Sequence, residues 1–195
     1  MPVVTITLIE GYGDEVKTGL AERLTDAVRA SIAAPLDGIT VQINEVTPSG
    51  YMRGRVARKP GAPVPDAARI VRDFLAAMEA RDLKSAQGML AEDFTMVFPG
   101  TGPMRTLAEL IDWAKDRYAQ VAKTYERFDV APGADGVTVY CFGALHGEWL
   151  DGRAFEGIRF IDRFTVADGK IVDQRVWNDM GETLLSEARG RDAAE

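Results

Sequence analysis

The sequence has little cysteine, little histidine and a deficit of positive charge. A single cysteine, Cys141, excludes a disulfide within the chain, and with a single histidine, His146, it argues against a Cys/His zinc site. Lysine and arginine number 23 against 30 acidic residues, so the formal net charge is −7. A chain this acidic lacks the basic face with which proteins bind nucleic acids or anionic membranes, so we expect neither partner.

Long hydrophobic runs are also missing. No apolar stretch reaches the roughly 18 residues of a membrane span, and the first residues lack the charged and apolar regions of a secretory signal. We therefore expect a cytoplasmic protein, and no motif indicates a metal or another cofactor. With 46% hydrophobic and 27% charged residues, the composition is typical of a globular protein.

Proline divides the chain. Three prolines lie within residues 57–66, and they favour extended, semi-rigid backbone that cannot donate hydrogen bonds. We therefore expect three segments: a first domain at residues 1–56, a linker at 57–66 and a second domain at 67–195.

The first domain has a β-α-β pattern. Val3 to Ile9 is rich in β-branched residues and predicts a strand, and Ile39 to Val46 alternates apolar and polar residues as a second strand does. Between them, apolar residues recur at helical spacing after Asp14, which we expect to cap the helix. So short a crossover favours parallel strands. Two strands and one helix bury too little surface to be stable alone, so we expect assembly with other copies or with the second domain.

In the second domain, helix signals precede strand signals. Asp66 and Asp82 are typical helix caps, and Thr106 with Glu109 forms a capping box that predicts a helix through about Ala122. Glycine-containing turns then separate four strand-like runs, at 124–131, 137–149, 154–166 and 170–177. This order predicts an α+β domain in which a curved antiparallel sheet folds over helices as a cone and encloses a pocket.

Pro2 is a candidate catalytic residue. Removal of the initiator Met1 would leave a secondary amine at the N-terminus, held at the start of a strand, and such an amine can act as a general base. The alternative is that Met-Pro is a common start with no chemical role.

The stretches M-P-V-V-T-I-T-L-I-E-G and A-P-L-D-G-I-T-V resemble the 4-oxalocrotonate tautomerase family over roughly residues 2–56. This resemblance implies that Pro2 moves a proton between carbons of an enol acid, in a trimer or hexamer. Tyr12 and Thr40 stand where the family has arginines that bind a dicarboxylate, whereas Tyr51 matches its C-terminal aromatic residue. Arg53 is a candidate for the missing cation, or else a solvated loop residue.

The stretches L-A-E-D-F-T-M-V-F-P-G and F-I-D-R-F-T-V-A-D-G-K-I-V-D resemble SnoaL-like proteins of the nuclear transport factor 2-like superfamily, over roughly residues 66–186. The resemblance implies a cone-shaped domain that forms dimers. Its members include cyclases, isomerases, dehydratases, hydrolases and non-catalytic binding proteins, so the fold does not determine the activity. Asp162 matches an aspartate that acts as acid and base in the SnoaL-like cyclases.

The residues themselves also single out Asp162 and His146. Asp162 is the lone acid in an apolar strand face, which suits a general acid or base, or a structural aspartate paired with an arginine or a backbone N–H. His146 shares a strand face with Glu148 and could move protons with it, or be a plain surface histidine. A two-residue turn at Asp151-Gly152 would pair Asp162 with Cys141, on the face opposite His146. Only a bulge or an odd-length loop would bring both into one pocket.

We therefore expect a proton-transfer enzyme, a tautomerase or isomerase acting on a small enol or carbonyl substrate. The candidate pocket aromatics, which ordinary core packing would also explain, are Trp113, Tyr118, Tyr125, Trp149 and Trp177. One alternative makes the first domain a non-catalytic scaffold for a SnoaL-like cyclase, dehydratase or hydrolase, and another makes the chain a small-molecule-binding protein. We expect a homo-oligomer, a hexamer or else a trimer or dimer.

Overall fold

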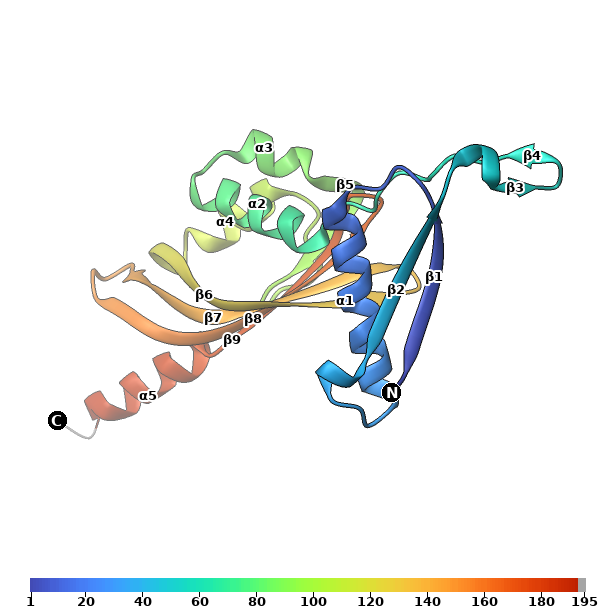
Figure 1. Cartoon of the computed structure of the whole chain (residues 1–195). Helices are drawn as coiled ribbons and strands as arrows, with labels where there is room; N and C mark the ends of the chain where they lie inside the picture. The colour runs from blue at the N-terminus through green and yellow to red at the C-terminus, as the bar shows by residue number, and fades with distance from the viewer. Residues whose placement is uncertain (193–195) are drawn as a thin grey trace. The chain divides into compact units, whose positions relative to one another are not determined.

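The computed structural model describes residues 1–192 and divides into two compact units, Met1–Pro63 and Val64–Glu195 (Figure 1). Residues 193–195, which the sequence assigns to the second domain, lie outside the described residues. The fold is mixed α+β, as predicted. In the described part of the chain, no helix combines the length and apolar character needed to cross a membrane.

The first unit is a β-α-β element followed by a small hairpin. Its strands β1 and β2 are parallel and in register from Val3 opposite Thr40 to Ile9 opposite Val46, which confirms the predicted crossover. Its elements are β1 Val3–Ile9, α1 Asp14–Ser31, the 3-10 turns η1 Leu36–Gly38 and η2 Pro48–Gly50, β2 Thr40–Val46, β3 Met52–Arg53 and β4 Val56–Ala57.

The predicted cap of α1 is wrong. Gly13 occupies the N-cap position with no side-chain hydrogen bond, and Asp14 is the first helical residue. The carboxylate of Asp14 instead pairs with the Lys17 ammonium at 3.1 Å, one turn further along the helix. An acidic side chain in the first turn still interacts favourably with the positive end of the helix dipole.

No residue of the first unit is buried in the single chain. The alternating residues Val4, Ile6 and Leu8 of β1 reach only partial burial, and Val3, on the other face of the sheet, is 61% exposed. A unit with no buried residue has no core of its own, because hydrophobic stabilisation scales with the apolar area removed from water.

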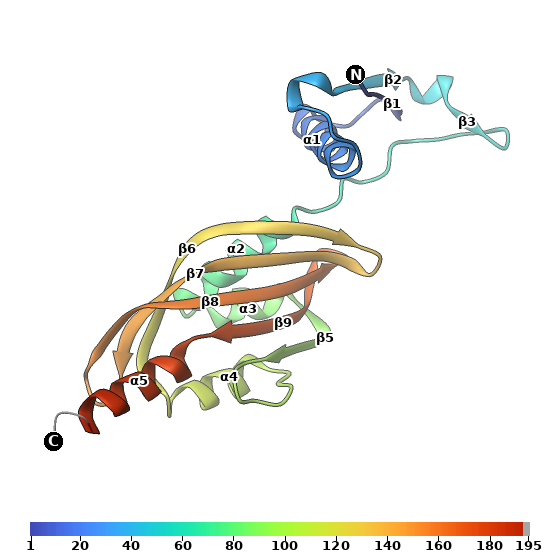
Figure 2. The same cartoon turned by 90° about the horizontal axis from the view of Figure 1, so that it is seen from below.

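The second unit is a five-stranded sheet, and the helices between residues 67 and 114 lie on one face of it (Figures 1 and 2). Its elements are α2 Ala67–Glu79, α3 Leu83–Gly88, β5 Leu90–Val97, α4 Leu107–Ala114, β6 Tyr118–Gly133, β7 Gly136–Trp149, β8 Ala154–Ala167, β9 Lys170–Asn178 and α5 Met180–Asp192. The strand order is β5-β9-β8-β7-β6. The predicted antiparallel meander is confirmed for β6 to β9, but β5 pairs with β9 in parallel, so the sheet is mixed.

Local signals place the helix starts correctly. The Asp66 carboxylate accepts backbone N–H bonds at the start of α2, and the Asp82 carboxylate accepts the Ser85 N–H at the start of α3. Thr106 and Glu109 form the predicted reciprocal capping box before α4.

The predicted end of this last helix is wrong. Helix α4 stops at Ala114, and residues 118–122 are the beginning of β6 instead. Backbone pairing decides this, because Tyr118 lies opposite Trp149 and Ala122 lies opposite His146 on β7. A sheet partner 24 or more residues away is invisible to local helix patterns, and it overrides the helix propensity of this segment.

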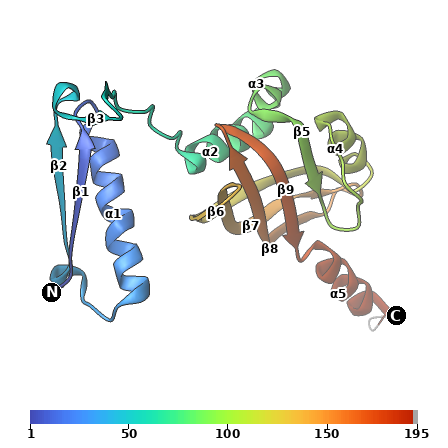
Figure 3. The same ribbon diagram turned by 90° about the vertical axis from the view of Figure 1, so that its right-hand side faces the viewer.

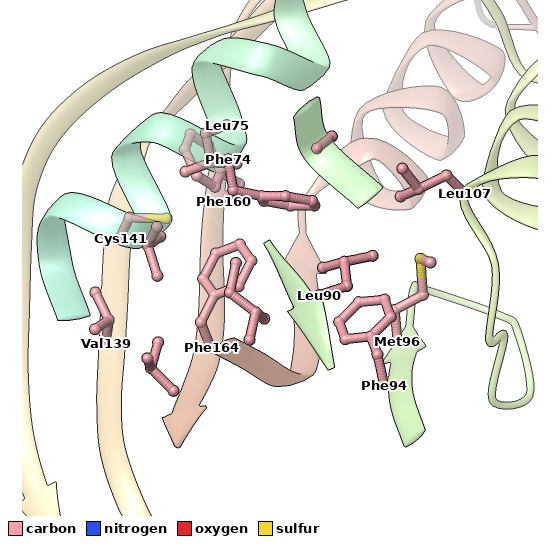
Figure 4. Close-up of a cluster of buried hydrophobic side chains, with 14 of the residues drawn as sticks. Phe74, Leu75, Leu90, Phe94, Met96, Leu107, Val139, Cys141, Phe160 and Phe164 are labelled. Atoms are coloured by element: carbon pink, nitrogen blue, oxygen red, sulfur yellow. The ribbon is translucent and has the colours of Figure 1, made fainter. Parts of the chain in front are cut away.

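The core lies between α2 and the concave face of the sheet (Figure 4). Phe74 of α2 meets Phe164 of β8 edge to face, with ring centroids 6.0 Å apart. Cys141 and Val139 of β7 are fully buried beneath the same helix. This packing fixes which residues of β6 to β9 point toward the helices, and therefore which side chains can line a pocket.

Candidate functional site

Pro2 and Thr40 are neighbours in the first unit. Pro2 immediately precedes β1, and its carbonyl oxygen accepts the Thr40 backbone N–H at 3.1 Å. This bond holds Pro2 at the amino-terminal end of both parallel strands. The residue is therefore positioned by the sheet, as a proline with a chemical role would need to be.

The other candidates of the first unit lie at the opposite end of the sheet. Tyr12 follows β1, and Tyr51 and Arg53 follow β2, so all three lie beyond the carboxyl ends of the strands. Figure 3 shows the amino terminus and β3 at opposite ends of this unit. A seven-residue strand spans about 20 Å. A single chain therefore does not bring Pro2 together with Tyr12, Tyr51 or Arg53.

The second unit contains a cavity of about 670 Å³ between the helices and the sheet. Helices α2 and α4, strand β6 and the inner faces of β8 and β9 supply its walls. The lining is mainly apolar and aromatic, from Phe74, Leu75, Met78, Phe98, Leu110, Ile111, Trp113, Tyr118, Val121, Tyr125, Leu145, Phe160, Val176 and Met180. The volume and this lining are typical of small-molecule sites.

Asp162 lies behind the cavity wall, on β8. It is fully buried, and its Oδ2 accepts a hydrogen bond from the Lys123 ammonium of β6. Its Oδ1 is buried and has no hydrogen-bond partner within the part of the chain that the structure describes. Of the two residues, only Lys123 lines the cavity, and its side chain is 20% exposed. The partner expected for a structural aspartate was an arginine or a backbone N–H, and the structure supplies a lysine.

Aromatic rings pack against this ion pair on the side that faces the cavity. The Lys123 Nζ lies 4.6 Å from the centroid of the Phe160 ring, in a cation–π contact. Tyr125 meets the same Phe160 ring edge to face at 5.9 Å. Burial, with Cys141 and Asp162 nearby, raises the pKa of the Tyr125 phenol, so Tyr125 keeps its proton at neutral pH and can donate a hydrogen bond.

Two further polar side chains of the cavity wall have an atom without a hydrogen-bond partner among the described residues. Gln174 of β9 is 3% exposed, and its Oε1 is buried without a hydrogen bond. The indole N–H of Trp113 on α4 is likewise buried and unpaired. Buried polar groups are normally hydrogen-bonded, so these two atoms leave hydrogen-bonding capacity unused next to the cavity.

His146 and Glu148 are on the other face of the sheet. His146 is exposed and lies opposite Ala122 of β6, whereas its strand neighbours Cys141 and Leu145 point to the core. An odd-length turn after Trp149 does occur, but a bulge at Glu156 and Gly157 compensates for it. Cys141 therefore still pairs with Asp162, and the structure does not bring His146 and Asp162 into one pocket.

Of the predicted pocket aromatics, Trp113, Tyr118 and Tyr125 line the cavity, whereas Trp149 and Trp177 do not. Trp149 is buried beside Phe155, with ring centroids 4.4 Å apart, so it packs as a core residue. Lys123 and Gln174 are the pocket residues that sequence reasoning missed. Lys123 alternates with Val121 and Tyr125 on one strand face, but that signal is hidden once the preceding residues are assigned to a helix.

No group of three or more histidine, cysteine, aspartate or glutamate side chains that could hold a metal ion occurs within residues 1–192. The polar groups of the cavity lining are ammonium and guanidinium groups, one carboxylate, phenols and amides.

Comparisons with known protein families match both units. The family described as "Tautomerase enzyme" matches residues 2–58, and the SnoaL-like domain matches residues 71–174, more than half of the chain. A probable tautomerase of Bacillus cereus is 41% identical over 54 residues, which are 28% of this chain and 88% of that protein. The 2-hydroxymuconate tautomerase of Bacillus subtilis is 39% identical over 51 residues, 26% of this chain and 82% of that protein.

Solved structures similar to the chain show the fold of the second unit. An NTF2-like protein of unknown function from Burkholderia pseudomallei aligns with a TM-score of 0.53 at 18% identity, over 62% of this chain and 96% of that one. TerC, co-crystallised with polyporic acid, aligns with a TM-score of 0.51 at 16% identity, over 60% of this chain and 93% of that one. At these identities the likeness establishes the fold and not the activity.

Proposed function

Because this chain belongs to the tautomerase family over its first unit and to the SnoaL-like family over its second, we propose that it is a proton-transfer enzyme. It acts as a tautomerase or isomerase on a small enol or carbonyl substrate, and the second unit provides a cyclase- or isomerase-like pocket. Pro2 is the base of the first unit, and Asp162 is the acid and base of the second.

The observation that carries this proposal is the state of Asp162. It is a fully buried carboxylate directly behind the wall of a largely apolar cavity, with one oxygen bound by the cavity-lining Lys123 and the other unpaired among the described residues. An unpaired buried carboxylate oxygen is costly to the fold, and costly polar groups are kept where chemistry uses them. A carboxylate held in this way can take a proton from one carbon or oxygen of a substrate and return it to another.

The role of Pro2 depends on the fate of Met1. While Met1 is attached, the Pro2 nitrogen is an amide and has no basic lone pair; after its removal it is a secondary amine. An intact mass of the untagged protein distinguishes the two. A mass without Met1 supports Pro2 as a base, and a mass that retains Met1 excludes it.

We also propose that several copies assemble through the first unit, as a hexamer or a smaller oligomer. The unit has no buried residue, its strands leave Val3 exposed, and Pro2 lies a strand length from Tyr12, Tyr51 and Arg53. A second copy would cover apolar surface and could bring these residues to Pro2. Light scattering at micromolar concentration tests this proposal, and a monomer would contradict it.

A second candidate function is favoured by the two missing arginines. Tyr12 and Thr40 occupy the positions at which the tautomerase pattern resembled by the first unit has arginines. Without these cations the first unit would serve as a scaffold that assembles catalytic SnoaL-like domains.

Two variants separate these candidates, with 2-hydroxymuconate and phenylenolpyruvate as substrates. Loss of tautomerisation in Pro2→Ala, but not in Pro63→Ala, supports a catalytic first unit. Activity that survives Pro2→Ala and is lost in Asp162→Asn, but not in Asp93→Asn, supports the scaffold. Both control residues are exposed. A ligand that is retained without turnover in every variant would support a binding protein instead.

A further inference from the structure

The cavity wall presents more cationic than anionic side chains. Its ionisable side chains include the cations Arg81, Lys115 and Lys123 and the anion Glu79. Lys115 is paired with Asp112 at 2.5 Å, and Lys123 is paired with Asp162. Since Asp162 is fully buried and does not line the cavity, the Lys123 ammonium is the member of its ion pair that the cavity meets.

From the charged groups and the apolar lining of the cavity, we infer that it binds a ring-sized apolar molecule that carries one anionic oxygen. The Lys123 ammonium is the group that binds this oxygen. The inference specifies the substrate class of the cavity used in the proposed function, and it holds whether or not Asp162 transfers protons. Enolates, phenolates and carboxylates all present such an oxygen.

Lys123 is placed for this role by Asp162 on one side and by the cavity on the other. An ammonium has three N–H donors, and within the described residues Asp162 is the one acceptor that hydrogen-bonds to it. The face of the Phe160 ring, 4.6 Å away, restricts the remaining directions. For the binding of this ligand, the fully buried Asp162 positions the ammonium, and Lys123 is the group that reaches the ligand.

Neutral polar groups lie on the same inner face of the sheet. Tyr125 is two residues from Lys123 on β6, and its raised pKa keeps the phenol available as a donor. Gln174 also lines the cavity and contributes a neutral amide to its wall. One cation with neutral donors and acceptors beside it matches a ligand that has one charged oxygen and further polar oxygens.

The apolar part of the ligand has an aromatic wall to pack against. Phe98 and Trp113 meet at 5.3 Å between ring centroids, and both line the cavity. Arg117 covers the Trp113 ring, 4.2 Å from its centroid, which fixes the orientation of the indole. Rigid aromatic walls of this kind favour flat rings over flexible chains, because little side-chain entropy is lost on binding.

The experiment compares two probes of the same shape, 2-naphthoate and 2-naphthamide, by calorimetry with the full chain at neutral pH. The expected result is that wild type binds the naphthoate about ten-fold or more tighter than the amide, as a charge-assisted hydrogen bond predicts. Asp162→Asn should widen this preference, because the ammonium is then no longer neutralised by a carboxylate. Lys84→Met, an exposed lysine on α3, should leave the preference unchanged.

Lys123→Met alone would leave a buried carboxylate without a partner and could fail to fold, so the decisive variant is Lys123→Met with Asp162→Asn. This double variant should bind both probes with about equal affinity. Equal affinities in wild type, no naphthoate binding at millimolar concentration, or an unchanged preference in the double variant would each overturn the inference. If Asp162→Asn retains turnover and shows a larger preference for the naphthoate over the amide, Asp162 is not the proton carrier, and the binding role of Lys123 is supported.

Discussion

Removing the cation of the Lys123–Asp162 pair should destabilise the second unit more than removing the anion. In Lys123→Met the fully buried Asp162 carboxylate loses its one hydrogen-bond partner and its counter-ion. Breaking a buried ion pair from one side costs about 3–5 kcal/mol, and the 20% exposure of Lys123 places this case near 3 kcal/mol. Asp162→Asn leaves the cation next to the cavity, where water can solvate it, and should cost about 1 kcal/mol.

The double variant tests the origin of this cost. If the two changes were independent, their effects would add to about 4 kcal/mol. Because the cost of Lys123→Met is that of an unpaired buried charge, removing the charge as well should reduce the total to about 1–2 kcal/mol. The difference, a coupling of about 2 kcal/mol, is a double-mutant-cycle measure of the buried pair.

Urea unfolding followed by tryptophan fluorescence suits this measurement. All three tryptophans, Trp113, Trp149 and Trp177, belong to the second unit, so the signal reports its unfolding and not that of the first unit. The free energy of unfolding typically falls by about 2 kcal/mol per molar urea, so Lys123→Met should lower the urea midpoint by about 1.5 M. A midpoint within about 0.3 M of wild type would refute the reasoning. It would mean that the carboxylate of Asp162 carries no charge that Lys123 must balance.

Three further predictions concern the sheet and the helices that frame the cavity. Burial and the nearby Asp162 raise the pKa of the Cys141 thiol from 9.0 to about 12, so the unfolded state loses this proton first and stability should fall as the pH rises from 9.0 toward 12. Cys141→Ala should show a flatter fall in the urea midpoint over the same window, and an identical slope would contradict this. Gly143→Ala should prevent folding of the second unit, because an added Cβ would stand 1.9 Å from the Thr124 carbonyl oxygen; a native tryptophan emission spectrum would refute it. Thr106→Ala removes the capping-box hydroxyl of α4 and should cost about 1 kcal/mol in the same unfolding assay, whereas Thr101→Ala, outside the helix, should not weaken α4.

Much of the fold could be predicted from local sequence, because local physics determines it. Alternating or β-branched residues gave β1, β2 and the strands from 137 onward, and side-chain caps at Asp66, Asp82 and Thr106 gave the helix starts. These features depend on residues within four positions of each other, so their signal is present in any short window.

The failures share a non-local cause. Residues 118–122 have helical periodicity, but in the structure they pair with β7. Strand β5 pairs in parallel with β9, which is distant from it in the sequence. No pattern within a segment specifies its sheet partner. The same limit applies to the candidate site. Asp162 can be predicted as the lone acid of an apolar strand face. Its partner Lys123 cannot, because it directly follows a segment that local patterns assign to a helix.

The sequence by itself determined the two-part architecture and the candidate acid Asp162, because alternation along a strand decides which residues share a face. Only the tertiary structure decided that Lys123 and Gln174 belong to the cavity and that His146 does not. The physical reason is register. One bulge or odd-length turn reverses the face of every residue beyond it, and here two such irregularities cancel between β7 and β8.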